Sequence, residues 1–79
     1  MAVKRRRRAR RDVERDYPKK QFVSKLRRLA DAIEAGRTFR IQVAGERIAI
    51  APDATIQIEH ERGDGVEEIE FQLRWPTSE

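Results

Sequence analysis

The residue types that most often perform catalysis are few in this chain, and they do not converge. His60 is the only histidine, and strand parity places it on an apolar face opposite Glu67. A general base needs an orienting partner and a substrate pocket, whereas a metal site needs further ligands at suitable spacing. Neither pattern surrounds His60, so we interpret it as a histidine at the rim of a core beside a carboxylate.

Other reactive groups give no stronger signal. Ser24, Ser78 and the threonines form no nucleophile motif, and the sequence contains no cysteine. The run Gly63-Asp64-Gly65 is typical of a turn, because a calcium loop needs more carboxylates in order and a phosphate loop more glycines. We therefore predict a protein that is not an enzyme, with no catalytic residue, metal, cofactor or small-molecule substrate.

Carboxylates gather on one predicted surface. Glu59, Glu68 and Glu70 share the outer face of a hairpin, and the predicted register puts Glu59 beside Glu68. One interpretation is a solvated face that prevents aggregation. The other is a docking site for cations, including the basic segment at the start of this chain or of a neighbouring copy.

That basic segment is the strongest feature of the charge pattern. Its seven cations are Lys4, Arg5, Arg6, Arg7, Arg8, Arg10 and Arg11. They bring the formal net charge of the chain to +4, although the remaining residues carry more acids than bases. Five further cations extend the positive charge along a predicted helix: Lys19, Lys20, Lys25, Arg27 and Arg28. Positive charge of this density favours contact with a polyanion.

Three roles fit the basic segment. It could bind nucleic acid without sequence preference, together with the helix cations, in which case affinity would fall steeply with salt. It could instead be an inert, solubilising tail, which we rank equally. Contact with an anionic membrane surface is less favoured, since no apolar anchor accompanies the charges.

The clearest element is an amphipathic helix over residues 18–35. Phe22, Leu26, Leu29 and Ile33 recur at helical spacing, Pro18 suits the first turn, and a glycine follows as the expected left-handed stop. Before it, residues 13–17 alternate as a short strand would, although residues 5–16 also suit a short helix.

Two hairpins follow the helix. Apolar residues alternate through 39–50 and again through 56–75, separated by Pro52. We place the turns at Gly45-Glu46 and Gly63-Asp64, which pairs Val43 with Ile48 and Ile58 with Ile69. Both registers put every apolar residue of a hairpin on one face.

The predicted fold class is α+β. One amphipathic helix packs on one face of a four-stranded antiparallel sheet made of two hairpins, with Trp75 closing the core and a short fifth strand near the N-terminus. Trp75 could alternatively be a ligand platform, but so small a domain needs its area in the core. We expect residues 1–11 to be a disordered basic arm, residues 12–76 a single domain, and residues 77–79 a tail.

The order of these features resembles the amphi-Trp domain family of small prokaryotic proteins. The matching segments are LRRLADAIEAG (residues 26–36), IQIEHE (residues 56–61) and IEFQLRW (residues 69–75). The resemblance implies an amphipathic helix followed by alternating strands that end in a tryptophan. It implies no assigned activity and transfers no site residue, and the arginine-rich arm is not part of the family pattern.

Length and composition limit the remaining choices. The 79 residues allow one domain with a thin core, since 38% are hydrophobic and 41% charged. No apolar run approaches the roughly 20 residues that cross a bilayer. We expect a cytoplasmic interaction or structural domain that binds an unidentified protein or itself, as a homodimer, without membrane insertion. The alternative is an accessory nucleic-acid binder that uses the arm and the basic helix face.

Overall fold

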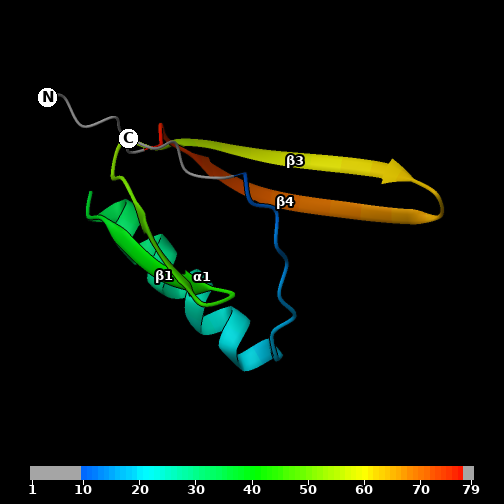
Figure 1. Ribbon diagram of the computed structural model, residues 1–79, viewed down its shortest axis with the longest axis horizontal. Coiled ribbons are helices and arrows are strands. Elements are labelled where there is room, and N and C mark those ends of the chain that lie inside the picture. The colour runs from blue at the N-terminus through cyan, green and yellow to red at the C-terminus, as the bar shows by residue number, and fades with distance from the viewer. Residues whose placement is uncertain (1–9, 78–79) are drawn as a thin grey trace, which may run out of the picture.

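The computed structural model describes residues 10–77 and contains one helix followed by four strands (Figure 1). The elements in chain order are α1 (Lys19–Glu34), β1 (Phe39–Val43), β2 (Glu46–Ile50), β3 (Thr55–Gly63) and β4 (Val66–Arg74). Strand β1 pairs antiparallel with β2, and β3 pairs antiparallel with β4. The α+β class, the amphipathic helix and the two hairpins are confirmed.

Local sequence explains both ends of helix α1. Pro18 occupies the N-cap position, where its missing N–H would have no helical acceptor. At the other end, Gly36 adopts a φ of 66°, and its N–H donates to the carbonyl of Ile33 at 3.1 Å. The N–H of Arg37 donates to the carbonyl of Ala32 at 2.9 Å, which completes a Schellman cap. The predicted helix ends are correct to within one residue.

Each hairpin reverses one residue away from the predicted position: the first turn comes one residue earlier and the second one residue later. The central turn residues are Ala44-Gly45 and Asp64-Gly65, with φ values of 47°, 83°, 52° and 75° in that order. Two consecutive positive φ values define a type I′ turn, whose twist matches that of the flanking strands. The predicted turns at Gly45-Glu46 and Gly63-Asp64 are therefore wrong, because the glycines take the second central position.

The shifted turns change which residues pair. Ile41 faces Ile48 in the first hairpin, and Ile58 faces Phe71 in the second. The predicted partners, Val43 for Ile48 and Ile69 for Ile58, are displaced by two positions. Because side chains alternate with a period of two, this displacement leaves every apolar residue on its predicted face.

The two hairpins do not join into the predicted four-stranded sheet. Within residues 10–77 they form two separate two-stranded sheets. At nine residues, β3 and β4 extend about 30 Å, whereas the five-residue β1 and β2 extend about 17 Å. The long hairpin projects from the rest of the molecule (Figure 1), and the radius of gyration is 15.3 Å instead of the roughly 12 Å of a compact domain.

The core lies where the C-terminal half of α1 meets β1. Ala32 and Phe39 are buried, each with 6% of its surface exposed. Beside them is a small cavity whose apolar lining includes Leu29, Ile33, Ile50, Ile56 and Leu73. The N-terminal half of the apolar helix stripe is open, since Phe22 is 52% exposed.

Residues 10–18 form neither the predicted short fifth strand nor a helix. Instead, the side chain of Arg11 reaches the turn of the first hairpin, where Nη1 lies 2.6 Å from Oε1 of Glu46. Its Nη2 donates to the carbonyl of Val43. The side chain of Arg11 thus bonds the segment to the β1–β2 hairpin, and residues 10–18 add no ladder of backbone hydrogen bonds.

Candidate interaction site

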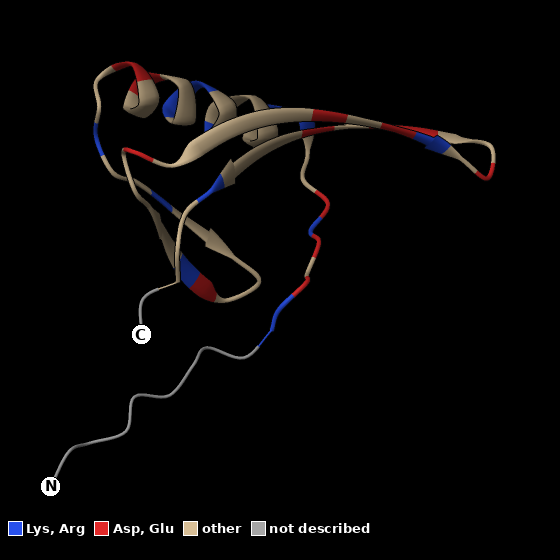
Figure 2. Cartoon of the chain, turned by 90° about the horizontal axis from the view of Figure 1, so that it is seen from above, with Lys and Arg blue, Asp and Glu red and all other residues tan. Residues whose placement is uncertain are grey.

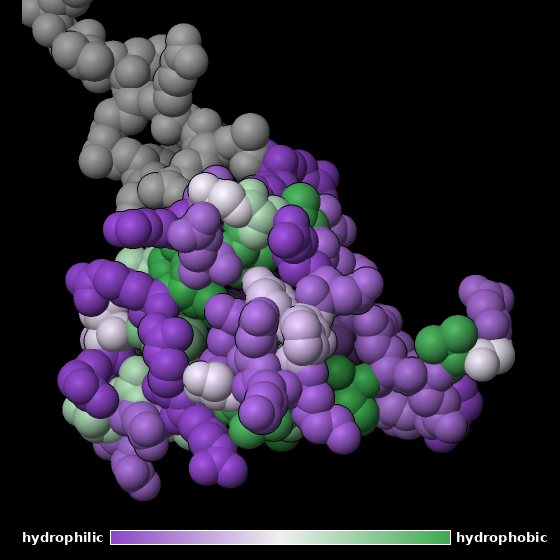
Figure 3. All heavy atoms as spheres, turned by 90° about the horizontal axis from the view of Figure 1, so that it is seen from below, coloured by the Kyte–Doolittle hydropathy of each residue, from purple (hydrophilic) through white to green (hydrophobic). Residues whose placement is uncertain are grey.

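The projecting β3–β4 hairpin has one apolar face and one acidic face. The apolar hairpin face consists of Ile56, Ile58, Ile69 and Phe71, which are 59%, 69%, 62% and 60% exposed. Apolar side chains are visible at the surface of the projecting hairpin in Figure 3. Most large apolar side chains in small proteins lie inside, so four such side chains on one open face form an unusual surface.

The sequence analysis expects this face to meet the helix stripe, and that expectation is wrong. Only the base of the hairpin reaches the core, where Ile56 and Leu73 line the small cavity together with Leu29. Ile58, Ile69 and Phe71 continue the same face outward along the hairpin. The apolar hairpin face is therefore an uncovered extension of the core.

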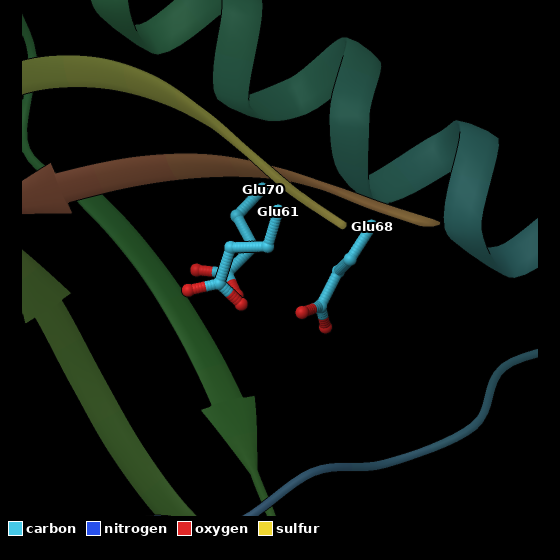
Figure 4. Close-up of side chains that lie close together, drawn as sticks. All are labelled: Glu61, Glu68 and Glu70. Carbon is cyan, nitrogen blue, oxygen red and sulfur yellow. The ribbon is translucent and has the colours of Figure 1, made fainter. Parts of the chain in front are cut away.

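The opposite face carries four glutamates at two neighbouring cross-strand pairs. Glu59 faces Glu70, and Glu61 faces Glu68. Figure 4 shows Glu61, Glu68 and Glu70 pointing to the same side of the hairpin, away from α1. Gln72 moderates the repulsion, because its Nε2 donates to Glu59 at 2.7 Å and to Glu70 at 2.9 Å. The shared outer face is as predicted, whereas the predicted pair Glu59 and Glu68 is replaced through the shift in register.

This crowding of like charges changes the acidity of one carboxyl group. A hydrogen bond with Glu59 and the charge of the same residue raise the pKa of Glu61 above 4.5, with smaller contributions from Glu68 and Glu70. Protonation of Glu61 relieves the repulsion. At neutral pH, the cluster consequently opposes the pairing of β3 with β4.

Three carboxylates of the acidic face lie close enough together to hold a cation, but they are at the surface. One oxygen each from Glu61, Glu68 and Glu70 lies within 4.8 Å of the others, on a solvent-exposed surface. Of the basic arm that was predicted to dock here, residues 4–8 lie outside the described residues. Arg11, which is described, contacts Glu46 of the first hairpin instead.

His60 takes part in an exposed ion-pair group near the hairpin tip. Its Nε2 lies 3.0 Å from Oε1 of Glu67, which also accepts hydrogen bonds from Nε and Nη2 of Arg62 at 3.2 and 3.0 Å. In the observed register His60 faces Ile69, and Glu67 is its diagonal neighbour. This agrees with a histidine at a rim, held by a carboxylate.

The predicted polyanion contacts divide into several groups. Lys4, Arg5, Arg6, Arg7 and Arg8 lie outside the described residues, and Arg10 is exposed beside Arg11. Lys19, Lys20 and Arg27 are exposed on α1. Lys25 and Arg28 are held in place, with Lys25 Nζ 5.1 Å from the ring centre of Tyr17 and Arg28 Cζ 5.4 Å from that of Phe39.

Arg40, Arg47 and Arg74 join this positive surface, and the sequence analysis does not include them. Arg40 and Arg47 line a groove with Lys25 and Arg28, and Arg74 lines a neighbouring groove. The sequence did contain a signal for these two residues, because Arg40 and Arg47 occupy the polar positions of the first alternating segment. That pattern would have placed both on the outer face of the β1–β2 hairpin.

Trp75 is half-buried at the end of β4. It lines two surface grooves, each of which also includes Ile48 and Thr77. The prediction that it closes the core is therefore correct only in part, because Trp75 lies near Ile48 of the first hairpin but is not fully buried.

The described part of the chain has no helix with the length and apolar character needed to cross a membrane. No family model, curated protein or solved structure matches this chain. The resemblance to the amphi-Trp family accordingly stays a prediction, and the function must be argued from the geometry.

Proposed function

We propose that this protein is a non-enzymatic interaction domain that pairs with a second copy of itself through the apolar hairpin face. The observation that carries the proposal is the exposure of Ile56, Ile58, Ile69 and Phe71, which lies between 59% and 69%. The non-enzymatic part is supported by the setting of the only histidine, which lies on the exposed rim of the hairpin with Nε2 3.0 Å from Oε1 of Glu67.

The hairpin needs a covering surface for its own stability. A two-stranded hairpin is marginally stable in water unless one face packs against another element. Here the base of the hairpin packs at the cavity beside Leu29, while the outer half lies beyond the reach of α1 in the same chain. Covering Ile58 and Phe71 would extend the small core along the whole hairpin.

The area of the apolar hairpin face suits a symmetric dimer. At their observed exposures the four side chains offer on the order of 500 Å² per copy, and a stable interface buries about 800 Å² per partner. Neighbouring helix residues, including the 52% exposed Phe22, would supply part of the remainder. A twofold interface uses the same patch on both copies, so one apolar face is sufficient.

The acidic face would restrict pairing between copies to the apolar side of the hairpin. Glu59, Glu61, Glu68 and Glu70 cover the opposite side of the same hairpin, as Figure 4 shows for three of them. Two such faces repel each other at neutral pH, so further copies would not stack on the dimer. The hairpin would accordingly form a closed pair in place of an open assembly.

Sedimentation over a range of protein concentrations tests the proposal. We expect a dimer for the full chain, and a monomer for the double variant Ile58→Gln/Phe71→Gln. The control Gln57→Asn/Glu68→Gln changes two residues of the opposite, acidic side of the same hairpin and should stay dimeric. A full chain that is monomeric at every concentration would overturn the proposal.

Cysteine labelling provides a second measurement that does not depend on dissociating the dimer. The natural chain has no cysteine, so Ile69→Cys and Glu68→Cys each introduce one thiol, on the apolar and acidic faces respectively. As protein concentration rises, alkylation at position 69 should slow, while alkylation at position 68 should stay constant. Equal rates at both positions throughout would contradict pairing through the apolar hairpin face.

A further inference from the structure

A second surface, on other elements, collects positive charge. One groove runs between α1 and the β1–β2 hairpin, and its charged lining consists of Lys25, Arg28, Arg40 and Arg47. The rest of its lining is formed by Ile41, Gln42, Ile48 and Ala49. We call this the basic groove. No residue of the apolar hairpin face lines it, so the inference below is separate from the proposed dimer.

The cations of the basic groove are available to a ligand. Each carboxylate ion pair identified within residues 10–77 uses Arg11, His60 or Arg62, and no carboxylate lines the groove. Arg28 is held over the ring of Phe39, and its Nη2 approaches the carbonyl oxygen of Arg40 at 3.4 Å. Positive charge that is held in place without a counter-charge suits an anionic ligand.

An aromatic residue adjoins this positive surface. A neighbouring groove shares Arg47, Ile48 and Ala49 with the basic groove and continues to Arg74 and Trp75. Trp75 is only half-buried and is one of the residues that line this groove. The two adjoining grooves thus bring five cations and one aromatic side chain to a single surface.

We propose that these two grooves bind single-stranded nucleic acid. Lys25, Arg28, Arg40 and Arg47 would contact successive phosphates, and an unpaired base would stack on Trp75. Proteins that bind single strands without sequence preference combine a positive groove with aromatic stacking in this way. A duplex keeps its bases stacked on one another, so it could not supply the base that Trp75 requires.

The distribution of charge over the molecule supports this placement. Figure 2 shows Lys and Arg on α1 and on the β1–β2 hairpin, whereas Asp and Glu predominate on the projecting hairpin. The acidic face would repel a phosphate chain and so restrict it to the basic side. The inference adds Arg40 and Arg47 to the predicted footprint, in which Arg11 is paired with Glu46.

The first experiment titrates the full chain with a labelled single-stranded oligonucleotide of about 12 nucleotides, as DNA and as RNA. Anisotropy reports binding, and the intrinsic fluorescence of Trp75, the only tryptophan, reports stacking. We expect binding of both strands with quenching of Trp75. Binding without quenching would place the oligonucleotide elsewhere, for instance on the basic arm, and would overturn the proposal, as would a lack of binding at low salt.

A double variant tests the groove itself. Arg40→Gln/Arg47→Gln removes two phosphate contacts, which should lower the slope of log affinity against log salt by about 1.4. This corresponds to binding weaker on the order of 50-fold at about 50 mM salt. The control Arg15→Gln/Arg62→Gln loses the same charge outside both grooves and should change the slope little. Equal slopes for the two double variants would contradict the proposal.

Two further experiments distinguish base stacking on Trp75 from binding through charge alone. Trp75→Leu should weaken oligonucleotide binding about tenfold, while Trp75→Phe retains most of the affinity. Inorganic polyphosphate has the charge but no bases, so it should compete weakly and leave Trp75 fluorescence unchanged. Polyphosphate that binds as tightly as the oligonucleotide would show that charge suffices and would overturn the role of Trp75. Circular dichroism confirms that each variant is folded.

Discussion

The two hairpins of this protein are built by the same rules and have different surroundings. Both reverse through a type I′ turn and both place their apolar residues on one face. The short β1–β2 hairpin packs on α1 and buries Phe39 to 6% exposure, whereas the long β3–β4 hairpin projects and leaves Phe71 60% exposed. An alternating pattern therefore determines which side chains share a face, but the neighbouring elements determine whether that face is covered.

The difference between the hairpins also separates two kinds of stability. The contacts of β1 with α1 lie within one chain, so they act at any protein concentration. The apolar hairpin face would gain its stability only when a second copy covers it, which makes that contribution depend on concentration. The predictions below test this distinction, in order of decreasing effect.

The largest effect should come from truncating the two phenylalanines. Phe39→Ala removes a buried ring and should cost about 3–5 kcal/mol of the free energy of unfolding, which approaches the whole stability of a small domain. Phe71→Ala should cost much less at low concentration, since its ring is already exposed. Denaturant unfolding of both variants measures the difference.

Protein concentration gives the control for this pair. The cost of Phe71→Ala should increase as the protein concentration rises, because the proposed dimer buries that ring. The cost of Phe39→Ala should be the same at every concentration. If truncation of Phe71 were as costly as truncation of Phe39 in dilute solution, the β3–β4 hairpin would already be covered within one chain, contrary to the structure.

The same contrast explains how much of the fold was predictable. The helix over residues 19–34 and the two alternating hairpins were correct, because each depends on local periodicity and on stop signals such as Gly36. The predicted turn positions were wrong by one residue. In the second hairpin the sequence does indicate the observed turn, because Asp-Gly is a preferred pair for type I′.

What could not be predicted is the relation between the elements. Nothing in the alternation of residues 56–73 distinguishes a strand that joins a four-stranded sheet from one that projects alone. The basic groove was missed for a similar reason, since Arg40 and Lys25 are distant in sequence and meet only when β1 packs beside α1. Of the predicted positive residues, Lys25 and Arg28 line this groove.

A smaller effect should follow from improving the turn of the first hairpin. Ala44 adopts a φ of 47°, a conformation that favours Asn or Gly, whereas the second hairpin already has Asp64 at the equivalent position. Ala44→Asn should raise the free energy of unfolding by roughly 0.5–1 kcal/mol. Thermal unfolding measures this gain. The control Ala49→Asn, within β2, should destabilise, and a gain at both positions would show that the turn is not the cause.

The smallest effect concerns the acidic face and depends on pH. Because Glu59 raises the pKa of Glu61 above its unfolded value of 4.5, the group contributes stability that is complete below pH 4.5 and is lost as pH rises through the folded pKa. At neutral pH, Glu61→Gln should therefore be more stable than the natural chain. The difference should shrink as pH falls toward 4.5, where Glu61 itself is protonated.

This pH dependence is checked by comparing the unfolding midpoints of Glu61→Gln and the natural chain between about pH 4.5 and 8. Titrating groups that both proteins share cancel in the difference between their midpoints. Glu34→Gln removes the same charge from the end of α1, away from Glu59, Glu68 and Glu70, and is the control for the loss of one carboxylate. A gap between Glu61→Gln and the natural chain that stayed constant, or that widened in acid, would mean that repulsion across the β3–β4 hairpin does not hold the Glu61 proton. The two hairpins would then not differ in electrostatic strain, and their contrast would reduce to the covering of their apolar faces alone.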